Sequence, residues 1–167
     1  MDLLHRLFPE RIDNTYRGHP LAIWLFAPLD LMKLLMGVGV AGLNPWVSNR
    51  HILESVDGVP LETFPAQAAS MIVFMSASWA LALLVIALLG LVVLIRYRAM
   101  IPLMFLALTI EQIGRKALSS IHIVRAAGET SGLSPSVAIN WALSVLLLVG
   151  LALSLLRSAK TQDTPDR

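Results

Sequence analysis

The sequence predicts an all-α integral membrane protein, a four-helix transmembrane bundle with both termini in the cytoplasm. Of its 167 residues, 56% are hydrophobic and only 14% are charged, whereas a soluble domain carries about 25% charged residues. Four long apolar segments supply the helices, and most basic residues lie on one side of them. The length suits a single transmembrane domain over residues 1–167.

Composition also excludes several classes of function. The chain contains no cysteine, which rules out disulfides, thiolate metal sites and dithiol redox chemistry. Its formal charge of +2 is too small to argue for nucleic acid. We therefore expect the lipid bilayer as the main partner, together with further copies of the chain or a larger membrane complex, and no cofactor.

The first predicted helix covers residues 20–43. Pro20 suits the first turn of a helix, because its missing N–H would have no partner there. Gly37 and Gly39, together with Gly42, make a smooth surface where a neighbouring helix can approach closely. A long polar connection over residues 44–65 then leads to the second helix.

The second predicted helix, over residues 66–95, contains no charged residue. Thirty helical residues reach about 45 Å, which exceeds a hydrocarbon core of about 30 Å, so this helix tilts or projects. The link over residues 96–98 is short and basic, which predicts an antiparallel hairpin with a third helix over residues 99–125. A fourth helix is predicted over residues 135–156, with Pro135 in its first turn.

The third segment decides how many times the chain crosses the membrane. Its uninterrupted apolar run, residues 100–110, is about half of the roughly 20 residues that a spanning helix needs. Apolar positions continue beyond Lys116 at helical spacing, which favours a helix that crosses. The alternative has three spans, with a re-entrant third segment and the C-terminal tail outside.

Basic residues favour an orientation without deciding between these two models. Four spans place eight of them inside, in agreement with the positive-inside rule: Arg6, Arg11, Arg17, Arg96, Arg98, Arg157, Lys160 and Arg167. Three spans also place eight inside. Because the basic end at residues 157–160 suits the cytoplasm, we predict four spans in a bacterial inner membrane.

Charged and polar residues lie at similar depths in the first and third helices. At 1.5 Å per residue, Lys33 lies about 20 Å from Pro20, and Glu111 lies about 18 Å from Ala99. An unpaired charge at such depth costs about 2.5–3.5 kcal/mol. We therefore predict a Lys33–Glu111 contact, with Asp30–Arg115 and Glu111–Arg115 as other pairings. The predicted intramembrane polar cluster consists of Asp30, Lys33, Glu111, Gln112, Arg115 and Lys116.

A second group of polar residues is expected on the outer side: His51, Glu54, His122 and Arg125. Two imidazoles and a carboxylate can bind a metal ion, but their spacing matches no metal motif. We therefore predict neither a metal site nor a catalytic residue.

The leading interpretation is a non-catalytic protein, either an accessory subunit or a binder of a lipid-like small molecule. The charged layer between the first and third helices would be its polar centre. One alternative is an ion- or proton-coupled carrier using Glu111 and Asp30. Another is a membrane enzyme that acts on a quinone or a lipid and uses the outer-side residues.

The plan resembles, in outline, small bacterial four-helix families such as the DoxX-like proteins. The shared features are a long loop after the first helix, a tight basic turn after the second, and a lysine late in the first helix, in LMKLLMGVGV. No function is carried over from this resemblance.

Overall fold

The computed structural model describes residues 2–9, 12–121 and 135–156, and within these ranges it contains helices and no strand. Four long helices dominate: α2 (Pro20–Val40), α4 (Ala66–Arg96), α5 (Ile101–Ile121) and α6 (Pro135–Leu155). Shorter helices are α1 (Asp2–Leu7), α3 (Asn49–Ser55) and the 3-10 turns η1 (Leu61–Thr63) and η2 (Arg98–Met100).

Three of the long helices are long and apolar enough to cross a membrane: Pro20–Val40, Ala66–Arg96 and Ala138–Leu155. α5 has 21 residues, as α2 and α6 do. Its charged residues, however, make it too polar to count among the helices that could cross a membrane by composition alone. The coarse prediction of a helical protein, with helices long and apolar enough to cross a membrane, is thus confirmed.

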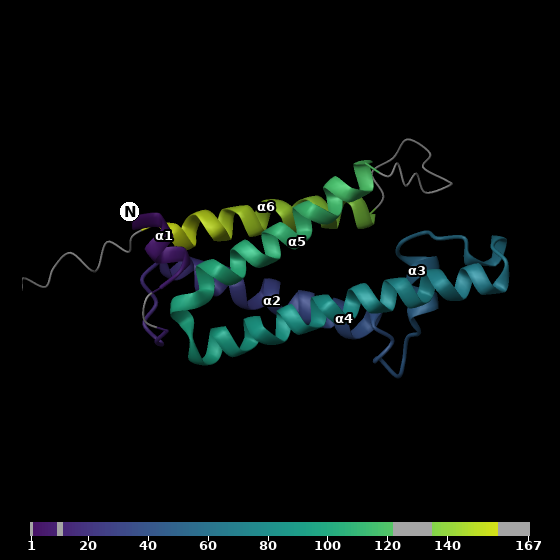
Figure 1. Cartoon of the computed structure of the whole chain (residues 1–167), viewed down its shortest axis with the longest axis horizontal. Coiled ribbons are helices and arrows are strands. Elements are labelled where there is room, and N and C mark those ends of the chain that lie inside the picture. Colours follow the sequence, from purple (N-terminus) through teal and green to yellow (C-terminus); the bar gives the residue numbers. More distant parts are fainter. Residues whose placement is uncertain (1, 10–11, 122–134, 157–167) are drawn as a thin grey trace, which may run out of the picture.

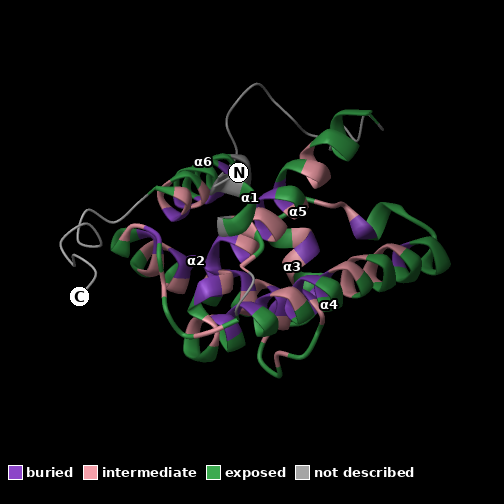
Figure 2. Cartoon of the chain, turned by 60° about the vertical axis from the view of Figure 1, so that its left-hand side comes forward, coloured by how far each residue is buried: buried purple, intermediate pink, exposed green. Residues whose placement is uncertain are grey.

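The long helices pack as two pairs, α2 with α4 and α5 with α6 (Figure 1). α2 also contacts α6, and α4 contacts α5. The buried core lies where the pairs meet, and the rings of Phe26 and Phe105 make an edge-to-face contact there, with centroids 5.1 Å apart. The outer side of α4 is largely exposed (Figure 2), as expected for a surface that contacts lipid.

Two helix ends differ from the predicted boundaries for local reasons. The first helix ends at Val40 rather than at residue 43, because Gly42 adopts a positive φ of 75°. The Leu43 N–H then donates to the Val38 carbonyl, which closes a Schellman motif. The third helix begins at Ile101 rather than at residue 99, because η2 forms the first turn after α4. Its predicted end, residues 122–125, lies outside the described residues.

Backbone contacts bring four helix ends together at one end of the molecule. The His19 N–H, just before α2, donates to the Leu153 carbonyl near the end of α6 (3.3 Å). The Ala99 N–H, between α4 and α5, donates to the Asp13 carbonyl (3.3 Å). The starts of α2 and α5 therefore lie beside the ends of α4 and α6.

Candidate functional site

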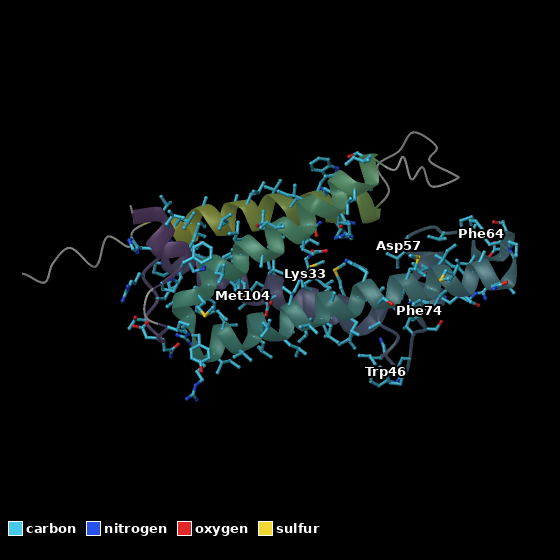
Figure 3. All side chains as sticks on the ribbon, viewed as in Figure 1. Lys33, Trp46, Asp57, Phe64, Phe74 and Met104 are labelled. Carbon is cyan, nitrogen blue, oxygen red and sulfur yellow. The ribbon has the colours of Figure 1, made fainter. Side chains whose placement is uncertain are left out.

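Lys33 is the buried cation at the centre of the polar cluster, and its side chain is 1% exposed. Its Nζ donates to Glu111 Oε2 at 2.8 Å and to Gln112 Oε1 at 2.6 Å. Figure 3 shows Lys33 between the α2–α4 pair and α5. The predicted contact between Lys33 and Glu111 is therefore confirmed.

Gln112 joins three helices through its side-chain amide and is fully buried. Its Oε1 accepts from Lys33 of α2 and from Arg115 Nη2 (2.9 Å). Its Nε2 donates to the backbone and side-chain oxygens of Asn140 on α6, at 3.2 and 3.1 Å. An amide has two acceptor and two donor positions, so Gln112 has none left for another partner.

Glu111 lies between two cations. Besides the contact with Lys33, its Oε1 lies 3.3 Å from Arg115 Nε, one turn further along α5. The predicted pairing of Glu111 with Arg115 therefore forms as well. Two positive side chains, Lys33 and Arg115, therefore share one carboxylate.

Aromatic rings cover the two cations at the edge of the cluster. The Arg115 guanidinium lies 4.8 Å from the centroid of the Trp79 ring on α4. Lys116 Nζ lies 3.5 Å from the centroid of the Trp141 ring on α6, and it has no hydrogen-bond acceptor among the described residues. Such cation–π contacts stabilise a positive charge near an apolar surface. No ligand is needed to explain the position of either tryptophan.

Asp57 is an acidic neighbour that the sequence pattern did not reveal. It follows α3 in the connection between α2 and α4 and is labelled in Figure 3. Burial raises the pKa of its carboxyl, and the positive charge of Arg115 acts in the opposite direction. This connection therefore brings a carboxyl within electrostatic range of α5.

Asp30 does not join the cluster, although it lies one turn before Lys33 on α2. The Asp30–Arg115 pairing does not form, and Asp30 Oδ1 has no hydrogen-bond partner among the described residues. The residue is only 2% exposed. Its carboxyl instead packs against Gly90 of α4, where a Cβ atom would overlap it.

The outer-side residues do not form a site within the described part of the chain. Glu54 pairs with Arg50 on the same short helix, Nε to Oε1 at 2.9 Å, and His51 is exposed. His122 and Arg125 lie outside the described residues. In the described ranges, no group of three histidine or acidic residues could hold a metal ion.

Besides Asp57, sequence reasoning missed Asn140 and Gly90, which shape the cluster and its surroundings. Asn140 is the only amide side chain in the fourth helix, whose other polar residues are serines, and that contrast was the available signal. Gly90 is one glycine in a long apolar helix, and nothing in the sequence marks which residue it faces.

No protein-family model matches this chain, and no curated protein or solved structure matches it either. The outline resemblance to DoxX-like proteins therefore gains no support from a family model. The case for a function rests on the geometry described above.

Proposed function

We propose that α5 is a fourth membrane span, so that α2, α4, α5 and α6 form a four-helix transmembrane bundle. α6 contains a candidate span, and α5 runs antiparallel beside it. Gln112 meets Asn140, and the Phe105 ring meets Gly150 ten residues further along α6. A helix that follows a spanning helix over this length lies in the same bilayer. Its 21 residues reach about 30 Å, which matches the hydrocarbon core.

Both termini are proposed to lie in the cytoplasm of a bacterial inner membrane. Arg17, Arg96 and Arg98 all belong to the end where the start of α2 meets the ends of α4 and α6. Only Arg50 is basic in the connection between α2 and α4. This asymmetry supports the orientation that the positive-inside rule assigns.

Reporter fusions test this topology. Fusions after Arg98 and after Arg157 are expected to report cytoplasmic, and a fusion after Gly58 is expected to report periplasmic. A periplasmic signal after Arg157 would contradict four spans and remove α5 from the spanning layer.

The function we propose is non-catalytic: the protein is an accessory subunit of a membrane complex or a binder of a lipid-like small molecule. The observation that carries this proposal is that the central network joins α2, α5 and α6 through polar side chains. Lys33, Glu111 and Gln112 direct their polar atoms at one another, at Arg115 and at Asn140. Groups directed at one another in this way hold helices together.

Binding would then use the apolar outer surface of the bundle. Large side chains are exposed along α4: Met71, Phe74, Met75, Leu81, Val85, Leu88, Leu89, Val92 and Ile95. Lipid, a second copy of the chain or a larger complex can cover this surface. The carrier alternative uses Glu111 and Asp30, and in the structure Glu111 lies between the cations of Lys33 and Arg115. The enzyme alternative depends on His122 and Arg125, beyond the described residues.

Native mass spectrometry of the protein extracted in lipid nanodiscs separates these functions. We expect a stoichiometric lipid-like molecule or protein subunit to remain bound. Proteoliposomes of the same preparation are expected to show no proton or ion flux above empty vesicles. Flux that Glu111→Gln abolishes at normal protein levels would contradict the proposal and favour the carrier.

A further inference from the structure

Asp30 is the most deeply buried carboxyl in the described part of the chain, and it stands apart from the central network. It lies ten residues after Pro20, about 15 Å along α2, which is the middle of a hydrocarbon core of about 30 Å. The residue is 2% exposed, and its Oδ1 has no hydrogen-bond partner among the described residues. In an ionised carboxylate in this position, Oδ1 would be neither solvated nor paired within the described part of the chain.

Among the described residues, no cation forms an ion pair with Asp30. α4, which packs against Asp30, carries no titratable residue between Ala66 and Ile95, and Arg96 lies about 9 Å beyond Gly90 along the helix and is exposed. Lys33 on α2 itself donates to Glu111 and Gln112 of α5. α6 carries no charged residue between Pro135 and Leu155.

The space around the carboxyl excludes a metal ion. Asp30 fills the position that a side chain at residue 90 would occupy, so its oxygens touch the α4 backbone. A metal ion needs several oxygen ligands at about 2.0–2.6 Å, and no cluster of acidic or histidine residues in the described ranges supplies them. A proton adds no volume and needs no further ligand.

We propose that Asp30 is a proton-binding site within the membrane, and that its carboxyl is held in the protonated form where α2 and α4 pack together. The glycine at position 90 makes room for the acid. The ligand of this site is a single exchangeable proton. This inference goes beyond the proposed function and rests only on α2 and α4 lying in the bilayer, so it holds for a subunit, a lipid binder or a carrier.

Infrared spectroscopy of the purified protein in nanodiscs at mildly alkaline pH tests the proposal. A protonated carboxyl has a carbonyl stretch separate from those of carboxylates and amides. We expect such a band in the wild type, shifted when the aspartates carry a ¹³C carboxyl. The other five aspartates lie outside the candidate spans, and are expected to be ionised there.

Two variants assign the band. Asp30→Asn is expected to remove it completely. Asp57→Asn, which changes an aspartate outside the candidate spans whose pKa is raised by burial, is expected to leave it unchanged. If the Asp30→Asn variant does not accumulate, the band is assigned from Asp57→Asn protein instead. A ¹³C shift that persists in that protein comes from an aspartate other than Asp57, and Asp30 is the aspartate that lies in a candidate span. A wild-type spectrum with no ¹³C-sensitive carboxylic acid band would overturn the proposal, as would a band that persists in Asp30→Asn.

Discussion

Lys33 and Asp30 lie one turn apart on α2, yet the protein buries them in different ways. Lys33 faces α5 and is paired, with two acceptors on Glu111 and Gln112 within 2.8 Å. Asp30 faces α4 and packs against Gly90, and its Oδ1 has no hydrogen-bond partner in the described part of the chain. The first arrangement holds α2, α5 and α6 together through polar bonds, and the second depends on close backbone packing. The way in which a charged residue of an apolar helix is buried therefore depends on which neighbouring helix its side chain faces.

The largest expected effect on stability comes from removing one member of the Lys33–Glu111 pair. Lys33→Met or Glu111→Leu leaves a buried charge without its partner, which costs about 3–5 kcal/mol. Unfolding of the detergent-solubilised protein measures the loss. Arg50→Met is the matched control, because Arg50 and Glu54 form an exposed pair, and such pairs contribute at most about 1 kcal/mol.

The second prediction concerns the packing of Asp30. Gly90→Ala forces a Cβ atom into the Asp30 carboxyl, and overpacking of this kind costs about 1–3 kcal/mol. Gly114→Ala on α5 is the control, since nothing lies within 4 Å of its added Cβ and alanine favours a helix over glycine. Equal stabilities of the two variants would contradict the close contact between α2 and α4.

A smaller effect is expected at the edge of the network. Asn140→Ala removes the side-chain acceptor of Gln112 Nε2 but leaves the backbone acceptor in place, so we expect a loss of about 1 kcal/mol. Ser144→Ala removes only a hydroxyl that donates to the Asn140 carbonyl within α6, and serves as the comparison. Unfolding curves that rank Ser144→Ala as the more damaging change would remove Asn140 from the network.

The smallest effect is a pH dependence that arises outside the membrane. Burial raises the pKa of Asp57 in the folded protein, so its contribution to stability is present at low pH and lost as the pH rises through that pKa. Because the residue as a whole is exposed, the change in melting temperature is expected to be small. Asp57→Asn should remove it, while Glu62→Gln, an exposed acid on η1, should not.

Helix positions and the Lys33–Glu111 contact were predictable because both follow from periodicity and from rise per residue. The depths of Lys33 and Glu111, counted at 1.5 Å per residue, were enough to predict that the two charges lie in the same layer. The direction in which each side chain points was not predictable in this way. The Asp30–Arg115 pairing was proposed on similar depths, but Asp30 and Lys33 face different helices, so only Lys33 reaches α5.

The remaining features depend on packing between helices that are distant in the sequence. Trp79 and Trp141 could be assigned to helices from the sequence, but their contacts with Arg115 and Lys116 require the arrangement of α4 and α6 around α5. The charge of Arg115 acts on Asp57 only because the connection between α2 and α4 places the two groups within electrostatic range. Such contacts carry no local sequence signal.

The central claim is that Lys33 and Glu111 form one structural unit, and a double-mutant cycle tests it most directly. Unfolding free energies are measured for the wild type, Lys33→Met, Glu111→Leu and the double variant. We predict that the double variant recovers much of the loss, with a coupling energy of about 0.5–3 kcal/mol, because no buried charge is left without a partner. Losses that simply add would contradict the claim, and would leave Arg115 as the residue that holds Glu111.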